Sequence, residues 1–172
     1  MTEATTPQAD DECPKFRTHK ERGEYVELRF MVQAMLHGFQ VSRPWGDSAS
    51  YDVGLELGSR ILRVQVKSTA FRTGTGYFCQ FTPNTRRKKQ YSIEQIDFFA
   101  AYVMPQDVWY LIPSPILLGE RYKSGVMMCP MQPLKKNYYK YECYREAWDL
   151  MREDQGAAAR IEASSKPPRQ HL

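Results

Sequence analysis

Three polar residues carry the strongest chemical signal in this sequence, namely Asp52, Gln65 and Lys67. The last two lie in a Val-Gln-Val-Lys segment, whose alternation is typical of a strand. Because residues two apart on a strand point to the same face, Gln65 and Lys67 share one face. Val64 and Val66 share the opposite face, and we expect them in the core.

A hairpin is expected to bring the acid to the amide and the amine. Gly58-Ser59 has the composition of a tight turn, and it separates a strand predicted over Tyr51–Leu57 from one over Arg60–Ser68. The register that this turn sets places Asp52, near the start of the first strand, beside the polar residues of the second. An acid, an amide and an amine then converge on one edge of a sheet.

These groups suit metal-assisted hydrolysis of a phosphodiester. A carboxylate such as Asp52 binds a hard cation such as Mg²⁺, which prefers oxygen ligands. The amide oxygen of Gln65 is a neutral second ligand, and Lys67 is suited to orient the attacking water or to stabilise charge on the phosphate. One more carboxylate would complete the site, and the first predicted helix offers Glu24 and Glu27. The alternative is a solvated hairpin face, which the hairpin residues alone do not exclude.

Asp52, twelve intervening residues and Gln65-x-Lys67 resemble the core motif of the PD-(D/E)XK nuclease superfamily. The spacing of Gly23, Glu27 and Gly38-Phe39 resembles the opening helix of archaeal Holliday-junction resolvases. The wider chain is similar to the PD-(D/E)XK endonuclease domain associated with group I introns. Its matching blocks follow in order over roughly residues 20–150: GEYVELRFM, VSRPWGDSASYD, RVQVKST, QIDFFAAYV and WYLIP.

The resemblance implies a restriction-endonuclease-like fold and a metal-dependent DNA endonuclease. It implies that Mg²⁺, or Mn²⁺, is bound by Glu27, Asp52, Gln65 and the carbonyl of Val66, while Lys67 assists the nucleophilic water. It also implies that the substrate is double-stranded DNA. A homodimer or homotetramer is expected, because two active sites are needed to cut two strands.

Two positions depart from the superfamily pattern. Tyr51 stands where the motif has Pro, and Gln65 stands where it has the second acid. The intron-associated branch resembles this chain in having Gln there, so the change does not by itself imply inactivity. It removes one negative charge, and we expect weaker metal binding with Glu27 contributing more. The alternatives are a catalytically inactive DNA-binding module of the same fold and a structural or adaptor domain.

The identity of the helix carboxylate stays open between Glu24 and Glu27. The spacing to Gly23 and Gly38 favours Glu27, whereas on a helical wheel Glu24 lies nearer the apolar positions. The two residues are three apart, so they cannot both occupy one ligand position.

The charge distribution favours a polyanionic partner. The chain has 24 basic and 20 acidic residues, and four of the acids but none of the bases fall within residues 1–12. A basic surplus of this kind attracts nucleic acid, although many basic proteins bind none. The candidate DNA-contacting residues are Arg72, in a loop expected after the second hairpin strand, and the run Arg86, Arg87, Lys88 and Lys89.

The elements that must position the site follow from apolar periodicity. Residues Tyr25, Leu28, Met31, Val32, Met35 and Leu36 recur at helical spacing, and Gly38 follows as a stop signal. The order predicts an α/β or α+β domain with a mixed central sheet of four or five strands flanked by helices. Helices are expected over Lys20–His37, from a capping box at Ser92-Ile93-Glu94-Gln95, and over about Tyr141–Met151. Further strands are expected over Phe39–Ser42, Tyr77–Phe81, Phe98–Met104 and Val108–Ile112.

Length and composition limit the remaining possibilities. With 172 residues and 42% apolar residues, the chain has material for one domain, which we place at residues 19–152 between disordered tails at 1–18 and 153–172. The four cysteines form no CxxC pair, so neither a zinc ribbon nor a disulfide framework is indicated. No signal peptide or membrane span is visible, and we expect a cytoplasmic protein without membrane contact.

Overall fold

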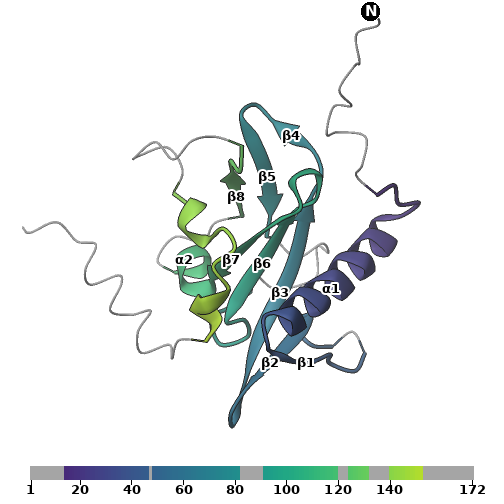
Figure 1. Cartoon of the computed structure of the whole chain (residues 1–172). Helices are drawn as coiled ribbons and strands as arrows, with labels where there is room; N and C mark the ends of the chain where they lie inside the picture. The colour runs from purple at the N-terminus through teal and green to yellow at the C-terminus, as the bar shows by residue number, and fades with distance from the viewer. Residues whose placement is uncertain (1–13, 47, 82–90, 120–123, 132–139, 153–172) are drawn as a thin grey trace, which may run out of the picture.

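The computed structural model describes residues 14–46, 48–81, 91–119, 124–131 and 140–152. Of the two tails expected from the sequence, only residues 14–18 fall within this part. A long helix crosses one face of a twisted sheet, and the second helix and the smaller sheet lie on the other side (Figure 1).

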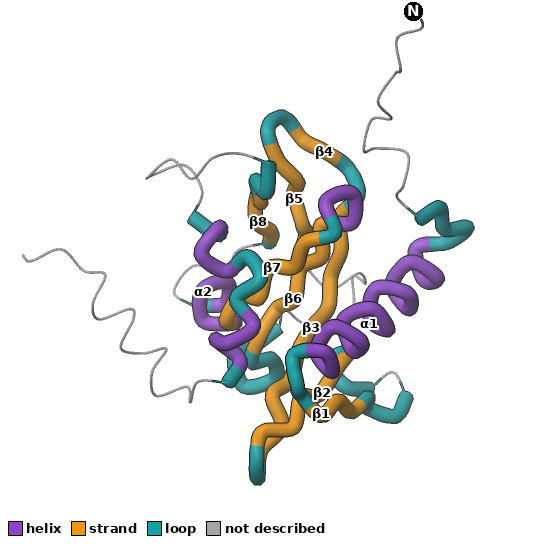
Figure 2. The backbone as a smooth tube through the Cα atoms, viewed as in Figure 1, coloured by secondary structure: helices purple, strands orange, loops and turns teal. Residues whose placement is uncertain are grey.

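The central sheet has five strands in the order β1-β2-β3-β6-β7. Neighbouring strands are antiparallel except β3 and β6, which are parallel, so the mixed sheet expected from the sequence is confirmed. A second sheet has the order β4-β5-β8. The strands are β1 Gln40–Ser42, β2 Val53–Leu57, β3 Arg60–Thr69, β4 Arg72–Thr73, β5 Gly76–Gln80, β6 Phe98–Val103, β7 Val108–Pro113 and β8 Gly125–Met128 (Figure 2).

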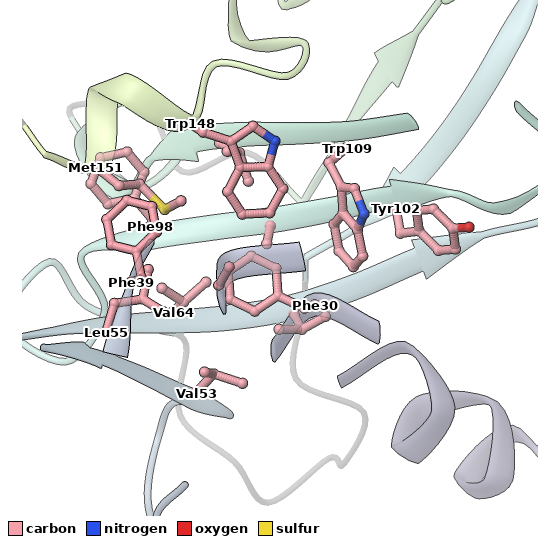
Figure 3. Packing of buried hydrophobic residues seen from close by; sticks show 14 of the residues in the cluster. Phe30, Phe39, Val53, Leu55, Val64, Phe98, Tyr102, Trp109, Trp148 and Met151 are labelled. Carbon is pink, nitrogen blue, oxygen red and sulfur yellow. The ribbon is translucent and has the colours of Figure 1, made fainter. Parts of the chain in front are cut away.

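The central sheet is buried on both faces, as β6 shows most clearly. All six of its residues are buried, and they alternate between two cores. One core lies under the first helix and includes Phe30, Trp109 and Trp148 (Figure 3). The other lies against the small sheet and includes Phe81 and Tyr110. A strand with apolar residues at every position is what this three-layer arrangement requires.

Helix α1 spans His19–Leu36 and has a strong signal at each end. The Thr18 side chain accepts a hydrogen bond from the backbone N–H of Glu21 at 3.1 Å, which satisfies one of the unpaired donors of the first turn. At the other end Gly38 has φ +81°, and its N–H donates to Met35 O while Phe39 N–H donates to Ala34 O. This pair of bonds is a Schellman motif, and the helix stop read from Gly38 is confirmed.

Most of the apolar residues whose spacing predicts α1 are exposed, and the helix buries other residues. The buried residues are Val26, Phe30 and Ala34, and the ring of Phe30 packs at 5.3 Å from Trp109 and 5.7 Å from Trp148, between ring centroids. Four of the periodic positions instead form an exposed stripe. The side chains of this stripe are Leu28, Val32, Met35 and Leu36, which are 53–75% exposed.

The helix expected from the capping box at Ser92 is wrong. Gln95 Oε1 accepts from the backbone N–H of Ser92 at 3.3 Å, but the segment makes only a turn. Ile96 is fully buried and Asp97 is 8% exposed, so the chain must leave the turn at once to enter β6. A local cap therefore forms, but tertiary packing ends the helix before it can extend.

The final helix expected over about Tyr141–Met151 is also wrong. The segment forms two short 3₁₀ turns, Glu142–Tyr144 and Trp148–Met151, separated by Glu146 at φ +51°. Glu146 N–H donates to Trp109 O at 2.8 Å, and its carboxylate accepts from Trp109 N–H at 2.6 Å. These bonds to the edge of β7 replace the helical bonds that the local sequence would otherwise form.

One further helix, α2 at Ser114–Leu118, has no counterpart in the sequence expectations. Strands β4 and β8 were not expected either. None of the helices in the described part is both long and apolar enough to cross a membrane.

Substitution of two glycines, Gly23 inside α1 and Gly38 just after it, should change the free energy of unfolding in opposite directions. Gly38→Ala should destabilise the protein by about 1 kcal/mol, because the left-handed conformation is unfavourable for a residue with Cβ. Gly23→Ala, inside α1 with no atom within 4 Å of the new Cβ, should stabilise by up to about 1 kcal/mol. Urea denaturation of both variants measures the two changes. Equal effects would contradict the assignment of Gly38 to the helix cap.

Candidate active site

The candidate site lies where β3 continues beyond the end of β2. Strand β2 begins at Val53, which pairs with Val64, so β2 covers this edge of β3 only up to that residue. A cleft of about 440 Å³ opens along the uncovered part. It is lined by the first half of α1, by β3 from Gln65 onward and by β5, which lie around this edge in Figure 1.

Asp52 is fixed to the open edge of β3 through both its backbone and its side chain. Its N–H donates to Val64 O at 2.9 Å, and its Oδ2 accepts from Val66 N–H at 2.8 Å. The amide of Gln65 also donates to the same Oδ2. The register expected from the Gly58-Ser59 turn is therefore present, and it sets the acid against the strand that carries the amide and the amine.

Gln65 has a role that an acid at the same position could not fill. Its side chain is 5% exposed, and its amide N–H groups allow it to donate to Asp52. A carboxylate there would have no proton to donate and would place a second negative charge beside Asp52, which is unfavourable in a buried position. Gln65 thus orients Asp52, and the cleft has one negative charge fewer than it would have with an acid at this position.

The structure brings Glu27 into the cleft and leaves Glu24 outside its lining. The Glu27 side chain is 21% exposed, and its Oε2 accepts from Nη2 of Arg43 at 2.9 Å. The Glu24 side chain is 52% exposed and lies 3.8 Å from the ammonium of Lys20. Because the buried face of α1 is not the face that the apolar pattern indicates, the helical-wheel argument for Glu24 loses its basis.

The two carboxylates of the cleft affect one another. Burial raises the pKa of Glu27, and the negative charge of Asp52 raises it further. The positive charges of Arg43 and Lys67 act in the opposite direction but do not cancel the increase. An acid with a raised pKa in a cleft with a second acid is typical of a functional site.

Lys67 lines the cleft and is positioned by an aromatic ring. Its ammonium lies 5.9 Å from the ring centroid of Tyr91, which in turn packs edge-on against Phe99 at 5.6 Å. Burial and the charge of Asp52 raise the pKa of Tyr91 to about 12, so its ring stays neutral near pH 7. The ring can therefore hold the lysine by a cation–π contact without neutralising its charge.

Sequence reasoning missed Arg43 and Tyr91, which contact Glu27 and Lys67 of the cleft, and it also missed Phe71 and Phe78 of the cleft lining. Arg43 follows Glu27 by 16 residues and Tyr91 follows Lys67 by 24 residues, so neither contact has a local spacing. Of the candidate DNA-contacting residues, Arg72 is exposed on β4. The run Arg86, Arg87, Lys88 and Lys89 lies outside the described residues.

The donor set of the cleft is oxygen-rich but carries only two formal charges. Within the described part of the chain, no three His, Cys, Asp or Glu side chains gather to hold a metal ion. The cleft combines Glu27 and Asp52 with the amide of Gln65 and the backbone of Val66. Two carboxylates supplemented by neutral oxygens suit a hard cation that keeps several waters.

A family model described as PD-(D/E)XK endonuclease matches residues 17–151. The chain belongs to the PD-(D/E)XK endonuclease family. The structure of a bacterial homing endonuclease, I-Ssp6803I, is similar to this one, with 28% sequence identity and a TM-score of 0.68. The match covers 83% of this chain and 97% of that chain, and it confirms the restriction-endonuclease-like fold. Hjc, a Holliday junction resolvase from Archaeoglobus fulgidus, matches at 18% identity and a TM-score of 0.42, over 63% and 84% of the two chains. No curated protein matches the sequence significantly.

In this family member, the charge of Glu27 should reduce the stability of the metal-free protein. A group whose pKa is higher in the folded state stabilises the fold at low pH, and this contribution is lost as pH rises through the folded pKa. Glu27→Gln should therefore be close to wild type at pH 4 and gain stability relative to it by pH 7.5, with both proteins in EDTA. Thermal denaturation at the two pH values measures the change.

Glu24→Gln is the matched control for this prediction. It removes an exposed carboxylate one turn away, and exposed ion pairs contribute little, so its effect should stay within about 0.5 kcal/mol at both pH values. A Glu27→Gln protein that is less stable than wild type at pH 7.5 would show that the Arg43 pair outweighs burial and Asp52.

Proposed function

We propose that this protein is a metal-dependent endonuclease that hydrolyses phosphodiester bonds of DNA at the open edge of β3. The observation that carries the proposal is the meeting of Glu27, Asp52 and Lys67 in one cleft of a chain from the PD-(D/E)XK endonuclease family. The similarity to the bacterial homing endonuclease over nearly its whole length supports the same reaction class.

A divalent cation, Mg²⁺ or Mn²⁺, would be held by the carboxylates of Glu27 and Asp52, the amide oxygen of Gln65 and the carbonyl of Val66. When bound, such an ion lowers the pKa of a coordinated water and neutralises charge on the phosphate. Burial and, after it, repulsion by Asp52 raise the pKa of Glu27, and this supports the assignment, because a bound cation would stabilise the charged forms of both carboxylates.

The residues of the chain have separate tasks in the proposed reaction. Gln65 and the N–H of Val66 hold Asp52 in one orientation, and Tyr91 keeps the Lys67 ammonium over the cleft. Lys67 orients the attacking water and stabilises the negative charge that develops on the phosphate. The water oxygen forms the new bond to phosphorus and its proton passes to solvent. The bond from phosphorus to the sugar oxygen on the opposite side breaks, and that oxygen takes up a proton from solvent.

The chemistry of the cleft also limits the rival interpretations. A DNA-binding module without catalysis would explain Gln65, but it gives no reason to bring the partly buried Glu27 and Asp52 together where they repel a phosphate backbone. A structural or adaptor domain gives no reason for either feature. Like charges brought together in a partly buried cleft are unfavourable unless a ligand compensates them.

We propose double-stranded DNA as the substrate and a homodimer or homotetramer as the assembly, because cleavage of two strands requires two sites. The exposed stripe of α1, from Leu28 to Leu36, is apolar surface that a second copy of the chain can cover. We assign the nuclease unit to residues 19–152. We further propose a cytoplasmic location and, from the resemblance of its sequence blocks, membership of the branch associated with group I introns.

Lys67→Ala tests the catalytic proposal. Wild-type protein should nick supercoiled plasmid in Mg²⁺ and lose this activity in EDTA. The substitution should lower the rate by about two orders of magnitude or more, because it removes the charge that stabilises the transition state. Lys20→Ala, which removes an exposed lysine on α1 outside the cleft lining, is the matched control and should cut at the wild-type rate.

A Lys67→Ala protein with full activity, or wild-type cleavage that persists in excess EDTA, would rule out the proposed mechanism. DNA binding that weakens with salt but is never followed by cleavage would favour the inactive module. Absence of both activities would favour the adaptor.

The second prediction of the proposal concerns the DNA-binding residues. Replacement of Arg86, Arg87, Lys88 and Lys89 by Gln should weaken binding to all duplex sequences alike. For every phosphate that is no longer neutralised, the slope of log K against log salt should fall by about 0.9. Arg72→Gln should change the slope by the amount expected for one phosphate. Titration of duplex DNA at several salt concentrations measures both, and unchanged slopes would exclude these residues from the DNA footprint.

A further inference from the structure

Two exposed aromatic residues line the same cleft as the two carboxylates. Phe71, in the connection between β3 and β4, is 77% exposed, and Phe78 on β5 is 44% exposed. Neither belongs to the two cores. Aromatic side chains that a fold leaves exposed inside a functional cleft are better explained by a ligand than by stability.

Phe78 lines the cleft from the small sheet, and its ring lies close to β8. Its neighbours Tyr77 and Cys79 are buried, so strand alternation directs Phe78 to the opposite face of the small sheet. The ring lies across Gly125 of β8, where an added Cβ would be 2.5 Å from Cζ of Phe78. A glycine at this position leaves room for the ring against the strand, beside the cleft.

The cleft lining combines positive charge with apolar aromatic surface. Arg22 and Lys67 supply positive charge and suit a phosphate, whereas Phe71 and Phe78 offer apolar faces that a phosphate cannot use. A DNA strand presents both kinds of surface within one nucleotide, a charged backbone and a flat base. Bases in an intact duplex are stacked, so a base reaches a protein ring only when it leaves the stack.

We propose that Phe71 and Phe78 form a stacking subsite for one unstacked nucleobase of the strand that is cut. This inference rests on the proposed nuclease function and adds a substrate preference to it. DNA whose stacking is already weakened, by an unpaired base for example, binds more tightly because less base stacking must be broken on binding. Base–aromatic stacking tolerates any sequence, since every base has a π-face.

Binding in EDTA tests the subsite without cleavage. The probes are two fluorescein-labelled 30-base-pair duplexes, one fully paired and one with a single unpaired adenine at its centre, followed by fluorescence anisotropy. Wild-type protein should bind the unpaired duplex about ten-fold or more tightly, the gain expected from stacking of one base. Phe71→Ala should remove most of this preference, and Phe71→Leu should also reduce it because leucine is apolar but has no π-face.

Ile61→Ala is the matched control, because Ile61 is 49% exposed and lies near the start of β3, whereas β3 lines the cleft only from Gln65 onward. It should keep the wild-type preference. Phe71 is exposed, so its substitution should leave folding intact, and circular dichroism verifies this for each variant. Equal affinity of the wild-type protein for both duplexes, or an undiminished preference in Phe71→Ala, would overturn the subsite.

The failure of the subsite and the failure of the nuclease proposal give different results. If the plasmid is nicked in Mg²⁺ but the unpaired duplex is not preferred, the subsite is wrong and the nuclease stands. If the preference depends on Phe71 but no DNA is cut, the subsite stands and the chain is a binding module.

Discussion

The open edge of β3 beyond Val64 is the feature on which the rest of the site depends. Because β2 stops pairing there, the backbone of Val66 is available to bind the Asp52 side chain rather than a neighbouring strand. The same opening lets α1 approach from one face and the small sheet from the other, so that Glu27 and Phe78 reach one cleft. A longer β2 would satisfy more backbone hydrogen bonds but would cover this edge.

The cleft brings two partly buried carboxylates together, and the cations around them do not offset the effect of burial and repulsion on Glu27. Arg43 and Lys67 oppose the increase in the pKa of Glu27, yet burial and Asp52 prevail. Gln65 limits the repulsion, because it donates to Asp52 where an acid would add a third charge. In our account a divalent cation would stabilise the charged forms of both carboxylates, whose poor solvation and repulsion the raised pKa of Glu27 reflects. A site with Gln in place of the second acid therefore retains a reason to bind metal.

The hairpin could be predicted from sequence because its rules are local. A two-residue turn and period-two alternation are enough to place Asp52 beside Gln65 and Lys67. Helix α1 could also be predicted, but the face that it buries could not, because Leu28 and Val32 are apolar and yet exposed. The failures come from bonds between distant segments. The segment after Tyr141 leaves the helical conformation because Glu146 binds Trp109 across 37 residues. Arg43 contacts Glu27 and Tyr91 contacts Lys67, and neither pair has a spacing that a sequence pattern could show.

Anomalous diffraction from crystals of the protein grown with Mn²⁺ tests the central claim most directly, because it locates the metal without any assumption about the substrate. The account predicts a peak in the cleft within coordination distance of carboxylate oxygens of both Glu27 and Asp52, and loss of that peak in Asp52→Asn. A Mn²⁺ peak elsewhere, with Glu27 still paired to Arg43 and the cleft free of metal at saturating Mn²⁺, would contradict it.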